Sequence, residues 1–227
     1  ILYGVILGII LFSAFATQTF GLIYTKSSIV AFITGLNVIC VPFLTYLFFK
    51  DKIKLNVLIA TFIAVIGLYL LTMSGTLEFE KGEFLTLVCA ILFALQIIFT
   101  GKFSNQVNVF LLVLFQLITV SILALIFSLS LDSATFNISY NYAFFKAVII
   151  TAIFATVYAF LIQTYMQQFT TATKTAIIFT MEPVSAAIFA YFTANEVLTI
   201  VQFIGAVLII LATLIAELKF NKKSIHT

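Results

Sequence analysis

Glu182 is the residue of this chain whose type and surroundings most clearly suggest chemistry. It lies about ten residues inside a long apolar stretch, beside Pro183, where a carboxyl group at bilayer depth is costly unless it is paired, protonated or hydrated. One interpretation is that Glu182 exchanges a proton or binds a solute. The other is structural: a protonated Glu182 donates a hydrogen bond to the carbonyl of Phe179, which Pro183 leaves without its usual donor.

Several amide side chains in other apolar stretches could contribute to the same site. These are Asn37, Gln18, Gln163 and Gln167, of which Gln167 lies one helical turn beyond Gln163 on the same face. Their amides could bind a polar solute. Alternatively, they join helices through hydrogen bonds worth about 1 kcal/mol each. Both interpretations remain open from the sequence.

Enzyme chemistry is not expected, because the sequence lacks the groups that it needs. The only histidine is His226, near the C-terminus, and there is no HExxH pattern, no aspartate-rich motif and no nucleophile beside a base. We therefore predict no catalytic residue, no metal site and no cofactor.

The elements that carry these residues are predicted to be membrane-spanning helices. The 227 residues are 63% hydrophobic and 8% charged, which is too apolar for a water-soluble globule. Apolar stretches of about eighteen residues or more, enough to cross roughly 30 Å of hydrocarbon, recur along the chain. We predict an all-α integral membrane protein with eight spans, at about 1–23, 28–49, 55–73, 83–100, 107–131, 143–165, 173–193 and 199–218.

The eleven lysines provide the topology signal, since the chain has no arginine. Assigning loops alternately to the two sides gives eight lysines on one side and three on the other. The larger group is Lys50, Lys52, Lys54, Lys102, Lys174, Lys219, Lys222 and Lys223, and the smaller is Lys26, Lys81 and Lys146. The eight-lysine side, with the C-terminal tail 219–227, is predicted to be cytoplasmic. The tail lysines thus indicate orientation and not nucleic-acid binding, and the high Ile, Phe, Lys and Asn usage is typical of a bacterium, hence of an inner membrane.

An internal repeat relates the two parts of the chain at an offset of 145 residues. Seven of the 23 pairs between 14–36 and 159–181 are identical, where about two are expected by chance. The offset pairs Asn37 with Glu182 and Gln18 with Gln163. Matching spans are five apart, an odd number, so the copies are predicted to cross the membrane in opposite directions.

The repeat also predicts the domain organisation. The region 82–218 would be a complete repeat of five helices, whereas 1–75 shows only three. We therefore expect two further helices upstream of Ile1, in a ten-helix fold of two inverted five-helix repeats. The only two prolines, Pro42 and Pro183, lie in corresponding spans, and we predict that they break their helices near the binding site.

Two local patterns predict structure alone. Gly4 and Gly8 form a GxxxG pattern in the first span, which is typical of close helix packing. Thr199 and Gln202 have the spacing of a capping box at the start of the last helix.

The sequence resembles the EamA family of the drug/metabolite transporter superfamily. The matching segments are Gly21–Ser28, Ala31–Leu36, Val41–Leu44, Gly67–Leu71, Met181–Val184, Asn195–Thr199 and Gly205–Ile209. The likeness covers essentially the whole chain, with two departures: Asp51 stands where a glutamate is usual, and Ala212 where a glycine is usual.

This resemblance implies a secondary transporter of a small organic metabolite, such as an amino acid or amine, that works by alternating access, often as an exporter. It also implies that Phe93 and Gln96 face the substrate cavity. It does not select a substrate, because one fold carries many. A channel or a membrane-embedded enzyme are the alternatives, and a homodimer through the last span of each repeat is compatible with transport.

Overall fold

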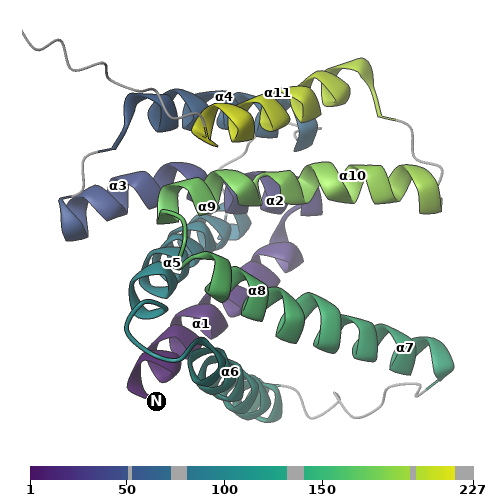
Figure 1. Cartoon of the computed structure of the whole chain (residues 1–227). Coiled ribbons are helices and arrows are strands. Elements are labelled where there is room, and N and C mark those ends of the chain that lie inside the picture. Colours follow the sequence, from purple (N-terminus) through teal and green to yellow (C-terminus); the bar gives the residue numbers. More distant parts are fainter. Residues whose placement is uncertain (51–52, 73–80, 132–140, 195–197, 218–227) are drawn as a thin grey trace, which may run out of the picture.

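The computed structural model describes residues 1–50, 53–72, 81–131, 141–194 and 198–217, and every regular element within these ranges is helical (Figure 1). The helices are α1 (Leu2–Tyr24), α2 (Ser27–Gly35), α3 (Asn37–Phe49), α4 (Leu55–Thr72), α5 (Lys81–Phe103), α6 (Val109–Leu131), α7 (Tyr142–Ile150), the π-helical stretch η1 (Thr151–Tyr158), α8 (Ala159–Met166), α9 (Ala172–Phe179), α10 (Met181–Ala194) and α11 (Ile200–Glu217). The chain is an all-α membrane protein.

The helices follow the predicted spans closely. Their ends differ from the predicted ones by at most three residues, the largest difference being at α5, which continues to Phe103 and not 100. Six helical stretches of the described chain are long and apolar enough to cross a membrane: Leu2–Tyr24, Ser27–Phe49, Leu55–Thr72, Lys81–Phe103, Val109–Ser130 and Phe144–Met166. The predicted span 173–193 corresponds to α9 with α10, and 199–218 to α11, so a total of eight crossings stays a prediction. The predicted tail 219–227 and most of the junction between the repeats lie outside the described residues.

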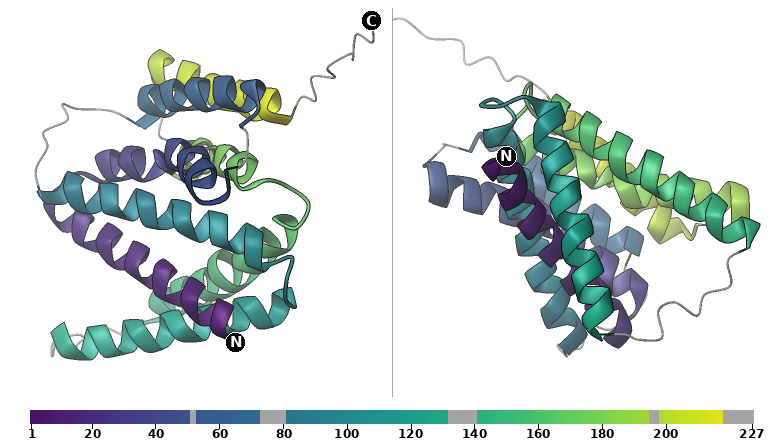
Figure 2. Two further views of the ribbon diagram at one scale, coloured as in Figure 1. Left: turned by 90° about the vertical axis from the view of Figure 1, so that its left-hand side faces the viewer. Right: turned by 90° about the horizontal axis from the view of Figure 1, so that it is seen from below.

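The helices pack in layers that Figures 1 and 2 show from three directions. The pair α4 and α11 lies at one end of the molecule, over the broken helices α2–α3 and α9–α10. Below them, α5 packs against α2 and α3 on one side and against α1 on the other. Helices α6 and α8 complete the far end, where α6 packs against both α1 and α8.

The predicted helix breaks are present, but they lie before the prolines. They fall at Leu36, between α2 and α3, and at Thr180, between α9 and α10, while Pro42 and Pro183 are inside the following helices. Pro183 has no N–H to donate to the carbonyl of Phe179, so that helix is interrupted one turn before the proline. Pro42 lies too far beyond Leu36 for the same explanation, and nothing in the structure connects it to that break.

The helix ends recur at the offset found in the sequence. Leu55 and Thr72 bound α4 while Ile200 and Glu217 bound α11, so both ends differ by 145 residues. The first residues of α2 and α9, and the last residues of α3 and α10, are also 145 apart. The 145-residue offset therefore relates helix boundaries as well as residue types.

Helices α4 and α11 are in close antiparallel contact through glycine. A Cβ at Gly67 would lie 2.8 Å from the carbonyl oxygen of Gly205, and a Cβ at Gly205 would lie 2.7 Å from that of Gly67. At the other end of the pair, Asn56 Nδ2 donates to the carbonyls of Ile215 and Ala216, both at 3.4 Å. Residue numbers increase along α4 while the numbers of the contacting residues decrease along α11, so the two helices run in opposite directions.

Both local structural predictions are confirmed. A Cβ at Gly4 would lie 2.6 Å from Phe115 Cβ and one at Gly8 would lie 2.5 Å from Thr119 Cβ, so the GxxxG face of α1 packs directly on α6. At the start of α11, the Thr199 N–H donates to Gln202 Oε1 at 2.9 Å, and the Gln202 N–H donates to Thr199 Oγ1 at 3.3 Å. This reciprocal pair is a capping box.

Candidate functional site

Two of the predicted site residues are in direct contact between α5 and α8. Gln163 Nε2 donates to Gln96 Oε1 at 3.3 Å, and Gln96 Nε2 donates to Thr100 Oγ1 at 3.1 Å. One turn further along α5, Gln168 Nε2 donates to the carbonyl of Ser104. Residues 96, 100 and 104 are each four apart and so follow one face of α5, with Ser104 directly after its last residue. That face is buried and polar, and Gln163 of α8 bonds to it.

Other buried polar groups, on α6 and at the end of α8, have no partner among the described residues. Gln167 on α8 is 2% exposed and Gln116 on α6 is fully buried, and within the described part of the chain no residue bonds to either amide. The buried hydroxyl of Thr164 is likewise without a partner there. Buried amides are normally hydrogen-bonded, because leaving one unsatisfied costs about 1–3 kcal/mol. These groups can bind water or a polar solute.

Gln18 and Phe93 lie near this region but contact other residues. Gln18 Nε2, on α1, donates to Thr34 Oγ1 of α2 at 3.5 Å. The ring of Phe93, on α5, packs edge to face with Phe15 of α1, with 5.7 Å between ring centroids. Both side chains are half-buried and connect α1 to its neighbours.

Asn37 and Glu182 occupy equivalent places in the two broken helices. Asn37 is the first residue of α3 and is 9% exposed, while Glu182 is the second residue of α10 and is exposed. Among the described residues no hydrogen bond joins them, and none joins Glu182 to the carbonyl of Phe179. In the first turn of α10, the partial positive charge of the helix N-terminus favours a carboxylate. The roles of both residues stay predictions.

The sequence analysis missed a second carboxyl group, Glu83. It is 4% exposed in the first turn of α5 and accepts a hydrogen bond from the Thr25 hydroxyl. Lys81 lies at the same end of α5, with its Nζ 3.2 Å from the Tyr24 hydroxyl and 4.5 Å from the centre of that ring. The predicted span began at residue 83, and no role was predicted for this glutamate. A carboxyl group beside a lysine at a span end was the available signal.

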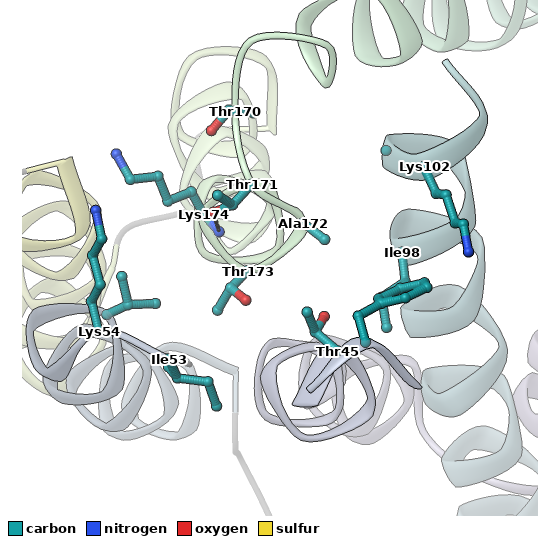
Figure 3. A pocket seen from close by; sticks show the side chains of 13 residues that line it. Thr45, Ile53, Lys54, Ile98, Lys102, Thr170, Thr171, Ala172, Thr173 and Lys174 are labelled. Carbon is teal, nitrogen blue, oxygen red and sulfur yellow. Dashed lines mark hydrogen bonds between the residues drawn. The ribbon is translucent and has the colours of Figure 1, made fainter. Parts of the chain in front are cut away.

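A pocket of about 460 Å³ lies at the opposite end of α5, between the end of α3 and the starts of α4 and α9 (Figure 3). Lys54, Lys102 and Lys174 line it, together with Thr45 and Thr173. These lysines were predicted only as topology signals, and their convergence on one pocket was not predicted. The run of threonines before Lys174, at 170, 171 and 173, was the signal that it left unused.

The position of the pocket can be compared with the two predicted groups of lysines. Lys54, Lys102 and Lys174 belong to the larger predicted group, and they surround one pocket at one end of the molecule. Lys81 belongs to the smaller group and lies at the other end of the 23-residue helix that carries Lys102. Among the described lysines at the two ends of α5, those of the larger predicted group thus lie at one end and Lys81 of the smaller group lies at the other, as the alternating assignment of loops predicts.

The comparisons with known proteins agree with one another. Residues 80–217, more than half of the chain, match the EamA-like transporter family. An uncharacterized transporter of Archaeoglobus fulgidus is 32% identical over 216 residues, which are 95% of this chain and 68% of that protein. A protein of known crystal structure is similar at a TM-score of 0.80, over 92% of this chain and 74% of that one; at 14% identity this likeness shows the fold alone. The chain belongs to the EamA-like transporter family, and it is a multi-pass helical membrane transporter.

Proposed function

We propose that this protein is a secondary transporter that exports a small polar organic metabolite, such as an amino acid or an amine, across the bacterial inner membrane by alternating access. The observation that carries the proposal is the hydrogen bond between Gln96 of α5 and Gln163 of α8, together with the buried amide of Gln167, to which no described residue bonds. In a transporter, buried hydrogen-bonding capacity that the protein itself does not use is what a polar solute requires.

The antiparallel pair of α4 and α11 supports the inverted repeat on which alternating access would depend. A two-fold axis between repeats offset by 145 residues would convert the contact of Gly67 with Gly205 into one of Ala212 with Ala60. Both alanines are fully buried and belong to one core cluster. A small residue thus occupies all four positions, as an interface that repeats itself by symmetry requires.

Within this architecture, the proposed solute site includes Glu182 and Asn37 at the starts of α10 and α3. Half-helix N-termini carry partial positive charge, which orients anionic or dipolar groups in transporters with broken helices. Gln18, Gln163, Gln167, Gln96 and Phe93 would complete the site from α1, α5 and α8. Family membership favours this transport function over an enzymatic one.

The expected result in a transport assay is counterflow. A panel of amino acids and amines is first screened by export from cells that express the protein. Liposomes that contain the purified protein and an excess of the unlabelled solute should then transiently accumulate the labelled solute above its equilibrium level. A carrier exchanges the two forms, so labelled solute is trapped inside. Entry that rises to equilibrium without an overshoot would indicate an open channel and contradict alternating access.

The proposed orientation places Lys54 in the cytoplasm and Lys26 outside. Both side chains are exposed, so Lys26→Cys and Lys54→Cys, each made with Cys40 and Cys89 replaced by alanine, form a matched pair. A membrane-impermeant maleimide added to intact spheroplasts should label the first variant, and should label the second only after permeabilisation. Labelling in the reverse order would show that the orientation is wrong.

A further inference from the structure

We propose that the lysine-lined pocket is an anion site, which binds the carboxylate or phosphate group of a small solute or of a phospholipid headgroup. This pocket lies at the end of α5, whereas the Glu83 contact lies at the helix's other end. The proposal concerns binding alone and does not depend on the proposed transport function.

The first argument is the charge of the pocket. Lys54 precedes α4 and Lys102 belongs to the last turn of α5, so two separate elements each bring one ammonium group, and Lys174 in the first turn of α9 also lines the pocket. Figure 3 shows Lys54 and Lys174 on one side of the pocket and Lys102 on the other. None of the lining residues that the structure describes is acidic. Like charges around a concave surface add their fields and attract a counter-ion.

Two threonine hydroxyl groups at the pocket have no hydrogen-bond partner in the part of the chain that the structure describes. The Thr173 side chain is 7% exposed and makes no hydrogen bond among the described residues. The hydroxyl oxygen of Thr45 is buried and also makes no hydrogen bond among them. These two residues lie on adjacent helices, α9 and α3, and their side chains are close to each other near the middle of the view in Figure 3. A threonine hydroxyl can donate to an anion as readily as it accepts. An oxyacid group between them would satisfy both.

The backbone at the start of α9 adds a third favourable contribution. Thr171 precedes α9, and its hydroxyl accepts the N–H of Lys174 at 3.4 Å. The pocket is therefore lined by the first turn of a helix, whose partial positive charge and remaining N–H groups favour an anion.

The size and the remaining lining restrict the ligand. A volume of about 460 Å³ is in the range of small-molecule sites. Apolar side chains, Ile53, Val57 and Ile98, line other parts of the pocket. The Lys102 ammonium lies 4.5 Å from the centre of the Phe49 ring, which holds it in place through a cation–π contact. The pocket thus suits an anionic group attached to a small apolar body, such as a short dicarboxylate.

Methyl NMR can test this proposal in the intact protein. The protein is placed in phosphatidylcholine nanodiscs with 13C-labelled threonine methyl groups, and titrated at constant ionic strength with succinate and with inorganic phosphate. At least one of these anions should shift the Thr45 and Thr173 signals saturably. Choline, a cation that serves as the control ligand, should not shift them. The Kd should rise at least about fivefold in Lys54→Gln and Lys102→Gln, the effect of removing one charge near the anion. Lys26→Gln, which removes an exposed lysine at the other end, is the matched control and should bind as the unmodified protein does.

A second arm identifies the source of the anionic group. If a phospholipid supplies it, nanodiscs containing phosphatidylglycerol should shift the same two methyl signals without added solute, and Lys54→Gln and Lys102→Gln should abolish the shift. Thr173→Ser should preserve binding of whichever probe responds, and Thr173→Val should weaken it, because only serine keeps the hydroxyl. No saturable response to succinate, phosphate or phosphatidylglycerol would overturn the proposal, and so would equal affinity in the lysine variants and the Lys26→Gln control.

Discussion

Replacing Gly205 with alanine is expected to destabilise the protein by about 1–3 kcal/mol, the usual cost of overfilling a well-packed contact. The added Cβ would lie 2.6 Å from the backbone nitrogen of Leu71 and 2.7 Å from the carbonyl oxygen of Gly67. Both are backbone atoms of α4, so no side-chain rotation can relieve the clash. The only remedy is a movement of α4 away from α11, which loses contacts along the whole antiparallel pair.

Gly101 provides the matched control for this substitution. It also lies in a helix, α5, but a Cβ there would meet nothing within 4 Å. Gly101→Ala should therefore be neutral or stabilise the protein by up to about 1 kcal/mol, because alanine is the better helix former. Unfolding of the detergent-solubilised proteins, followed by helical circular dichroism, gives the comparison. If Gly205→Ala unfolds at the same midpoint as Gly101→Ala, the close contact between α4 and α11 is not formed in the protein.

The same contact predicts how a second substitution behaves. A Cβ at Gly67 would lie 2.8 Å from the Gly205 carbonyl oxygen, so Gly67→Ala alone should also be destabilising. Once one methyl group has separated the helices, the other has more room. The double variant should therefore lose less stability than the sum of the two single losses, as is usual for residues in contact.

The positions of the helices could be predicted from the sequence, but which helices pack against each other could not. Apolar length determines where a helix can cross a bilayer, and the spacing of Thr199 and Gln202 is sufficient for a cap, because both depend on neighbours in the chain. The GxxxG pattern of Gly4 and Gly8 indicates a face where another helix can approach. It contains no information about which helix approaches, and the partner, α6, is known only from the structure.

The geometry of the candidate sites could not be predicted from the sequence, for related physical reasons. Pro42 removes one N–H, but the break lies earlier, at Leu36, so the position of this proline does not predict where the helix is interrupted. The lysines of the anion site are up to 120 residues apart, from Lys54 to Lys174, and only the folded helices bring them to one pocket. The contact of Gln96 with Gln163 was predicted only as shared membership of one site. Its direct hydrogen bond depends on where the fold places α5 and α8.

Replacing Glu182 with glutamine is expected to abolish transport of a cationic solute, or transport coupled to protons, while leaving folded protein in the membrane. Glu182 is exposed in the first turn of α10 and makes no hydrogen bond among the described residues, so the substitution breaks no contact there. The amide keeps the shape of the side chain and a hydrogen-bond donor. It removes the negative charge and the exchangeable proton, the two properties that the proposed role requires.

Three measurements on the Glu182 variants separate the functional role from the structural one. In liposomes, counterflow of a cationic solute, or net uptake of a solute driven by a proton gradient, should be absent for Glu182→Gln, and helical circular dichroism and the unfolding midpoint should match those of the unmodified protein. Glu182→Asp, which keeps the carboxylate one methylene group shorter, should retain part of the activity. Normal counterflow with unchanged pH dependence in Glu182→Gln would show that the carboxyl group takes no part in the cycle. The residue would then be architectural, since its partner at the equivalent position, Asn37, is an uncharged amide at the start of the corresponding half-helix.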